Sequence, residues 1–238
     1  MILALDSSTL TLSLALLRRD GSLVDEQLIP PPARQSQVLP EALTALLARH
    51  SLALKDVTGF VVGLGPGSFT GLRIGLATIK GLAFTLKVPA VGVSSLAALA
   101  LEGPAEATIF SCAMVKKGEV YLGRYRSDGH SLAPETSLTV SQLADALKAD
   151  SSARMIGPAL IETRAALEGQ GVRAEQLLAG PLVPSAKALA KLATVPSSYD
   201  AQALFSLEPH YLRGSGAEEN PKFPPLPGVP AVARLKED

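Results

Sequence analysis

A glycine-rich junction between two apolar runs constrains the fold of this chain most. Residues 59–63 form a short apolar run of the kind found in buried strands. The Gly-Pro-Gly turn at 65–67 follows, where glycine permits unusual backbone angles and proline fixes φ. Ser68 can then cap a helix, because its hydroxyl can accept a hydrogen bond from a backbone amide two or three residues later. The pattern predicts a strand, a sharp turn and a helix that extends to about Leu86.

Two glycines inside the predicted helix need an explanation. Gly71 and Gly75 are four residues apart, and Gly67 lies four residues before Gly71. A glycine within a helix costs about 0.5–1 kcal/mol relative to alanine, and close approach of another backbone is the usual compensation. Three interpretations are open at this point: a phosphate-binding loop, a tight turn packed inside one domain, and a helix that packs closely against a partner.

The junction lacks the defining residues of the known phosphate loops. A Walker A motif requires a lysine directly after its last glycine, but Gly71 is followed by Leu72 and the nearest lysine is Lys80. The dinucleotide-binding fingerprint fits poorly as well, because the glycine spacing is one residue too long and no acidic residue follows about twenty residues later. Packing, within the domain or against a partner, explains the stretch better.

Composition excludes several classes of protein. The chain has 238 residues, is 47% hydrophobic and carries 22 basic and 22 acidic residues. It can therefore bury a large core, while a net charge of zero argues against strong nucleic-acid binding by this chain alone. The single cysteine, Cys112, allows no internal disulfide and is expected to be buried. We expect a cytoplasmic protein without a membrane segment, because neither a signal peptide nor a run of about twenty apolar residues is recognised.

The predicted elements occur in two similar series. The first comprises strands at 2–5, 11–17, 23–29, 59–63 and 90–93, and helices at 38–50, 68–86 and 95–101. The second follows a boundary at Gly103-Pro104 and comprises strands at 107–115, 119–125, near Ser137 and at 154–157, and helices at 139–147 and 185–194, with 159–168 left open as helix or loop. The repetition predicts a duplicated α/β unit.

We divide the chain into two lobes and a tail. Residues 1–103 form the first lobe, and residues 104–213 form the second, whose last helix is expected to pack back on the first. Residues 214–238 contain five prolines and are expected to be a flexible tail.

The turn after the first strand is the main candidate for chemistry. Asp6, Ser7, Ser8 and Thr9 combine a carboxylate with three hydroxyls and could hold a nucleotide phosphate, or they could be an ordinary polar turn. A phosphotransferase of this layout would need a second acidic loop in the other half. Residues 111–118, at the corresponding place, contain no carboxylate, so the second acidic loop that phosphoryl transfer would need is missing.

Metal and protease sites find little support in the sequence. His50, His130 and His210 are eighty residues apart, so they form no helical histidine pair, and one cysteine makes no zinc framework. A Ser-His-Asp triad is compatible with the spacing, but no Gly-x-Ser-x-Gly elbow accompanies it. Glu119 and Tyr121 share one face of a predicted strand, which we interpret as a solvated strand entrance. The segment 208–213 is expected to anchor the chain against a domain before the tail.

Several segments together resemble the TsaB (YeaZ) family of bacterial tRNA threonylcarbamoyladenosine proteins. The resemblance extends over about 1–213, is strongest over 1–100 and rests on residues 2–9, 65–75, 91–96, 118–121 and 209–213. It implies a two-lobed actin-like and Hsp70-like α/β fold, also called the ASKHA or ribonuclease H-like fold, with duplicated β-β-β-α-β-α units.

The resemblance also implies a function without chemistry of its own. Such a subunit would dimerise with the catalytic paralogue TsaD, which makes N6-threonylcarbamoyladenosine next to the anticodon of tRNAs reading ANN codons. A TsaE-like ATPase would join the complex, and tRNA would be reached only through it. The implied partner interface comprises Gly67, Phe69, Thr70, Gly71, Arg73, Ile74, Gly75 and Thr78. No catalytic residue, metal or cofactor of its own is implied, and ATP at the complex interface and a homodimer of the isolated chain are left open.

Two departures from the family pattern and one rival function remain. Val115-Lys116-Lys117 stands where relatives often have Asp-Ala-Arg, and Arg34-Gln35-Ser36 stands where they often carry a histidine. The rival is a stand-alone ATPase or phosphotransferase of the actin-like class that uses Asp6 to Thr9.

Overall fold

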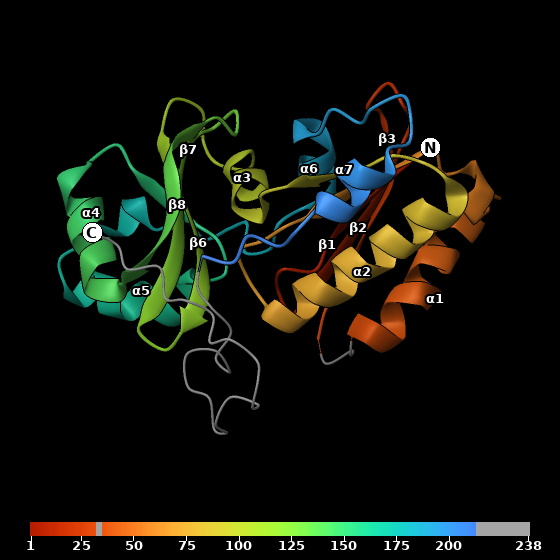
Figure 1. Cartoon of the computed structure of the whole chain (residues 1–238). Coiled ribbons are helices and arrows are strands. Elements are labelled where there is room, and N and C mark those ends of the chain that lie inside the picture. Colours follow the sequence, from red (N-terminus) through yellow and green to blue (C-terminus); the bar gives the residue numbers. More distant parts are fainter. Residues whose placement is uncertain (32–34, 213–238) are drawn as a thin grey trace, which may run out of the picture.

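The chain folds into two α/β lobes that lie side by side (Figure 1). The computed structural model describes residues 1–31 and 35–212. Lobe I contains β1 (Ile2–Asp6), β2 (Leu12–Leu17), β3 (Leu23–Ile29), α1 (Gln35–Ala48), β4 (Gly59–Gly63), α2 (Phe69–Leu86) and β5 (Ala90–Val93). The helix α3 (Ser95–Ala100) follows β5 and packs mainly with residues of the second sheet, among them Ile109 and Tyr125. Lobe II contains β6 (Thr108–Lys116), β7 (Glu119–Arg126), β8 (Ser131–Thr139), α4 (Val140–Ala149), β9 (Arg154–Ile156) and α5 (Leu160–Gly169). The helices α6 (Ala186–Leu192) and α7 (Ala201–Ser206) follow.

The two sheets share one topology. Lobe I has the strand order β3-β2-β1-β4-β5, and lobe II has the order β8-β7-β6-β9. In each sheet the second strand is antiparallel to the first and third strands beside it, and the next strand pairs in parallel with the first. This repetition confirms the duplicated, two-lobed actin-like fold that the sequence predicts.

Alternation along β1 explains how lobe I is layered. Leu3 and Leu5 belong to the core beneath α1 and α2, whereas Ile2 and Ala4 belong to the core beneath α6. Successive side chains of a strand point to opposite faces, so a strand covered on both faces reads as a continuous apolar run. The buried run at the start of the chain therefore places helices on both sides of this sheet.

The last two helices both return to lobe I. Leu189 of α6 packs in the core with β1 and β2. The ring of Phe205 in α7 packs at a tilt against that of Phe84 in α2 with centroids 5.6 Å apart, and the Phe205 carbonyl accepts a hydrogen bond of 3.0 Å from Lys80. The helix α7, a single short helix whose N-cap is Asp200, was not predicted from the sequence. The predicted tail at 214–238 lies outside the described residues.

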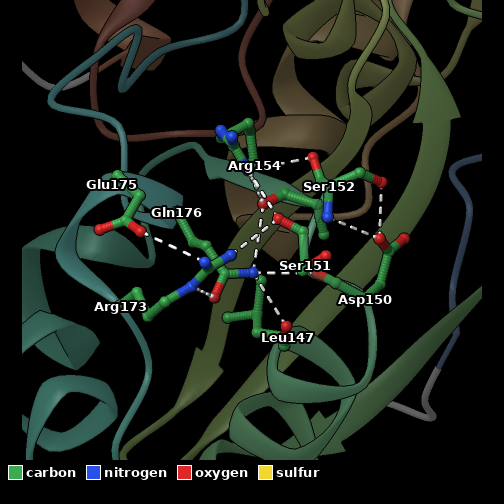
Figure 2. Close-up of polar contacts among 9 residues, drawn as sticks. Leu147, Asp150, Ser151, Ser152, Arg154, Arg173, Glu175 and Gln176 are labelled. Atoms are coloured by element: carbon green, nitrogen blue, oxygen red, sulfur yellow. Dashed lines mark hydrogen bonds and ion pairs between the residues drawn. The ribbon is translucent and has the colours of Figure 1, made fainter.

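One buried side chain closes the end of α4 in lobe II (Figure 2). Gln176 is 1% exposed, and its amide donates hydrogen bonds of 2.8 and 3.0 Å to the carbonyls of Leu147 and Asp150. The last carbonyls of a helix have no partner within the helix. Arg173 adds a hydrogen bond of 2.9 Å to the carbonyl of Ser151. We interpret this polar network as structural.

The glycine-rich junction folds largely as the sequence predicts. Ser68 is the N-cap of α2 and accepts a hydrogen bond of 3.2 Å from the amide of Gly71. By length and composition alone, α2 is apolar enough to cross a membrane, and no other helix of the described residues is. Because Leu76 and Ile79 pack into the lobe I core, we interpret this apolar character as that of a core helix.

Candidate functional site

Three polar loops meet at the carboxyl ends of β1, β4 and β5. They comprise residues 6–9, 63–68 and 94–95, and we call them the three-loop junction. The amide of Ser68 donates to the carbonyl of Ser8 at 2.7 Å, and the amide of Ser95 donates to the carbonyl of Gly65 at 2.9 Å. The parallel pairing of these strands brings all three loops to one edge of the sheet.

Asp6 lies at the centre of the three-loop junction and is fully buried. Its Oδ1 accepts hydrogen bonds from the backbone amide of Ser8 at 2.9 Å and from the hydroxyl of Ser8 at 2.6 Å. Its Oδ2 accepts from the hydroxyl of Ser95 at 2.6 Å. That hydroxyl in turn accepts from the amide of Gly65 at 3.1 Å. Both oxygens of Asp6 are therefore used to tie the loops together.

This arrangement does not present Asp6 to a ligand. Ser7 and Ser8 are also buried, and Thr9 donates its hydroxyl to the carbonyl of Thr11 at 2.8 Å. Burial raises the pKa of Asp6, although the hydrogen bonds from Ser8 and Ser95 oppose the shift. A carboxylate that holds a metal-bound phosphate needs access to it, so the geometry favours the interpretation of 6–9 as a structural polar turn.

The glycines of α2 approach the same turn. A side chain at Gly67 would overlap the carbonyl of Ser8, and one at Gly71 would overlap the carbonyl of Ser7. One at Gly75 would overlap the hydroxyl of Ser7. Gly71 and Gly75 are buried, so the close approach that they permit is made within this chain. The packing within the chain accounts for these two glycines, and a partner contact at them stays a prediction.

The other predicted interface residues lie on the outer side of α2. Thr70 and Arg73 are exposed, and Phe69, Ile74 and Thr78 are partly exposed. A partner contact at these side chains stays a prediction.

The segment after α7 reaches the junction, as the sequence analysis expected for 208–213. The amide of His210 donates to the carbonyl of Leu64 at 2.8 Å. Tyr211 stacks on Phe69 with ring centroids 5.3 Å apart, and its hydroxyl accepts a hydrogen bond of 3.0 Å from Nε of Arg73. The segment is thus anchored on both sides of the glycine turn.

A polar cluster joins the two lobes beside this segment. Glu135 of β8 accepts hydrogen bonds from the hydroxyls of Ser94 and Tyr125, and Nδ1 of His210 lies 3.7 Å from its Oε2. The contact with the Glu135 carboxylate raises the pKa of His210, and burial opposes this. Burial pulls the pKa of Glu135 up, but the contact with His210 and the hydrogen bonds from Ser94 and Tyr125 bring it below its usual value. Sequence reasoning missed Glu135, because no local pattern marks a carboxylate whose partners are distant in the chain.

We expect the contact between His210 and Glu135 to strengthen the junction only in a limited pH range. The pKa of His210 is raised, so its contribution is complete below the ordinary histidine value of about 6.5 and is lost as the pH rises through the raised pKa. The pKa of Glu135 is lowered, so its contribution is complete above the ordinary value of about 4.3 and is lost as the pH falls through the lowered pKa. Titration of the His210 ring by NMR checks this. Glu135→Gln should lower the pKa of His210, while Asp128→Asn, a change elsewhere in lobe II, should leave it unaltered. An unchanged titration in Glu135→Gln would contradict the assigned contact.

The remaining sequence candidates are dispersed. His50 pairs with Asp25 at 2.8 Å and His130 lies in an exposed turn. Lys116 pairs with Glu119 at 3.2 Å at the entrance of β7. Across residues 1–31 and 35–212, no group of three or more His, Cys, Asp or Glu side chains is placed to hold a metal ion.

A groove of about 490 Å³ lies between α1 and α2. Its lining includes Pro40, Leu43 and Thr44 of α1 and Thr78, Gly81 and Leu82 of α2. Of the predicted interface residues, Thr78 reaches it. The sequence predicts α1 as an amphipathic helix, but it does not predict that α1 and α2 form one surface.

Comparison with known proteins supports the family resemblance. The TsaD family, described as tRNA N6-adenosine threonylcarbamoyltransferase, matches residues 29–193. The tRNA threonylcarbamoyladenosine biosynthesis protein TsaB of Bacillus subtilis is 33% identical over 151 residues, which cover 62% of this chain and 66% of that protein. The TsaB protein of Escherichia coli is 32% identical over 135 residues, 55% of this chain and 57% of that protein. The matched region thus spans somewhat less than two thirds of these relatives.

Solved structures agree with this assignment over more of the chain. A Pseudomonas aeruginosa protein described as similar to peptidase YEAZ superposes with a TM-score of 0.73 at 29% identity, covering 89% of this chain and 99% of that one. YeaZ from the same organism gives a TM-score of 0.64 at 30% identity, covering 80% and 89%. The chain therefore belongs to the TsaD family of threonylcarbamoyladenosine proteins and, within it, to the TsaB (YeaZ) group that its motifs indicate.

Proposed function

We propose that this chain is a non-catalytic subunit of the complex that makes N6-threonylcarbamoyladenosine on tRNA. Its activity would be to bind and support a TsaD-like catalytic paralogue. The observation that carries this is the match to TsaB proteins of threonylcarbamoyladenosine biosynthesis, together with a fold in which Asp6, the carboxylate of the turn after β1, is buried.

The proposal includes that this chain catalyses no reaction itself. Asp6 is the residue that an actin-like ATPase or phosphotransferase would use, and its two oxygens are already bonded to Ser8 and Ser95. At the corresponding hairpin of lobe II, residues 115–117 supply two lysines and no carboxylate. Phosphoryl transfer works by placing metal and charge around the phosphate, and this geometry opposes such placement.

The outer face of α1 and α2 is the proposed contact with the paralogue. Its groove is apolar and lies on two adjacent helices, which suits the packing of a partner's helices. A TsaE-like ATPase would join the assembly, and tRNA would be contacted through the complex, since this chain has no net charge. We place the complex in the cytoplasm and propose that any ATP is bound at the subunit interface rather than by this chain alone.

Co-expression with the TsaD-like protein of the same organism, followed by size-exclusion chromatography, tests the proposal. We expect one complex to elute, and we expect threonylcarbamoyladenosine formation on tRNA by the purified paralogue and its accessory proteins to require this chain. Purified alone, the chain should not turn over ATP. Robust turnover that disappears in Asp6→Ala would favour the stand-alone enzyme instead. Elution of two separate proteins would remove the support for a dimerisation role.

A further inference from the structure

We infer that Arg73, whose guanidinium lies over the ring of Phe69 and is hydrogen-bonded to the hydroxyl of Tyr211, is a recognition site for a carboxylate of the protein that docks on α2. This inference rests on the proposed function and adds the chemistry of one contact and the residue that positions it.

The side chain of Arg73 is held in place by two aromatic residues. Its guanidinium carbon lies 3.9 Å from the centroid of the Phe69 ring and 5.8 Å from that of Tyr211. Nε donates a hydrogen bond of 3.0 Å to the Tyr211 hydroxyl. A guanidinium commonly stacks on aromatic faces in this way. The side chain is therefore ordered before any partner arrives, although it lies on the exposed side of α2.

The charged end of Arg73 has no acidic partner in the part of the chain that the structure describes. No ion pair with Asp or Glu involves it among residues 1–31 and 35–212. Nε is used by Tyr211, which leaves the two terminal nitrogens as donors. Two parallel N–H groups match the two oxygens of a carboxylate, and this bidentate geometry gives both strength and specificity. A preordered arginine also loses less side-chain freedom on binding.

The surroundings favour a protein carboxylate over a nucleic-acid phosphate. Binding to a phosphate backbone needs several basic groups in a row. The nearest lysine on α2 is Lys80, and its ammonium already donates a hydrogen bond to the carbonyl of Phe205. A single arginine flanked by aromatic rings is instead the composition of a protein interface centre, where Arg, Tyr and Phe are enriched.

Arg73 lies one helical turn before Ala77, the first α2 residue that lines the α1–α2 groove. Ala77 and Gly81 follow it at intervals of four residues and line that groove, so all three lie on one side of the helix. A partner that fills the groove would reach Arg73 at its end. The segment after α7 thus completes this surface by contributing Tyr211, a positioning residue that acts through Arg73.

The test is biolayer interferometry of the full chain and its variants against the TsaD-like protein of the same organism at low and high salt. We expect Arg73→Ala to weaken binding about 10-fold and to reduce its salt dependence. Arg73→Lys should recover only part of the affinity, because an ammonium lacks the planar fork. Tyr211→Phe keeps the ring, loses the hydrogen bond to Nε and should weaken binding about 3-fold. Arg126→Ala, an exposed arginine of lobe II, is the matched control and should bind as wild type.

The combination of changes distinguishes positioning from a direct contact. If Tyr211 acts through Arg73, Tyr211→Phe should add nothing to Arg73→Ala. Wild-type affinity in Arg73→Ala at both salt concentrations would overturn the inference, as would full recovery by Arg73→Lys. If Arg73→Ala weakened tRNA binding by the complex but left the affinity between the two proteins unchanged, Arg73 would bind phosphate and the inference would be wrong. The inference would also be wrong if the only effect of Arg73→Ala were to dissociate a homodimer of this chain. If the wild-type chain does not bind the paralogue, the proposed function is wrong. This result is obtained with the wild-type chain, before any variant is measured, so it can be distinguished from a failure of the Arg73 inference.

Discussion

Gly71→Ala is expected to destabilise lobe I by about 2–3 kcal/mol, the upper range for forcing extra atoms into a packed site. The added methyl would overlap the carbonyl oxygen of Ser7, which is backbone and cannot rotate away. The helix α2 would have to move off the turn, and this would lengthen the hydrogen bond of 2.7 Å from the amide of Ser68 to the carbonyl of Ser8. Urea denaturation monitored by circular dichroism measures the loss.

Gly81→Ala is the matched control on the same helix. A methyl at Gly81 would have no neighbour within 4 Å, so the variant should gain about 0.5–1 kcal/mol of stability from helix propensity. If Gly71→Ala kept the stability of the wild type and lost only its binding to the TsaD-like paralogue, the glycine would be needed for the partner contact and not for packing on the internal turn.

Gly75 offers a further check of the same packing. There the methyl would overlap the hydroxyl oxygen of Ser7, which is buried without a hydrogen-bond partner among the described residues. Removing that oxygen with Ser7→Ala should therefore cost little by itself and should rescue Gly75→Ala. A double-mutant cycle that gave purely additive effects would contradict this contact.

The glycines show where sequence reasoning succeeds and where it stops. The cost of glycine in a helix correctly predicts that something approaches closely at Gly71 and Gly75. The identity of the approaching group is a long-range property, because the turn at 6–9 reaches α2 only once β1 and β4 pair. The repeated order of strands and helices was readable in the same way, since hydrophobic period and turn residues are local.

The elements that the sequence analysis missed share this cause. The short helix α7 has six residues and depends on packing against α2 rather than on a strong periodic pattern. The contacts of Glu135 join β8 to α3 and to the segment after α7, and no spacing rule connects these positions. The same holds for Tyr211, whose partner Arg73 lies 138 residues earlier.

Asp6→Ala is expected to cost about 2–3 kcal/mol, because it leaves buried donors of Ser8 and Ser95 without an acceptor. Asp6→Asn should cost less, since its carbonyl can still accept from the amide of Ser8 and its size is conserved. The contrast between the two variants measures the structural role of this side chain without reference to any ligand.

The pH dependence separates a buried structural carboxyl from an exposed catalytic one. Burial raises the pKa of Asp6 in the folded chain, so the unfolded chain loses this proton at lower pH than the folded one. The stability contributed by the protonated group is complete below the ordinary aspartate value of about 3.9 and is lost as the pH rises through the raised pKa. Asp6→Asn has no such titration. The free energy of unfolding of the wild type relative to Asp6→Asn should therefore fall with increasing pH and then level off. A difference that rises with pH would mean that the ionised form is the stabilised one, as expected if Asp6 faced a cation, and it would reopen the phosphate-loop interpretation of residues 6–9.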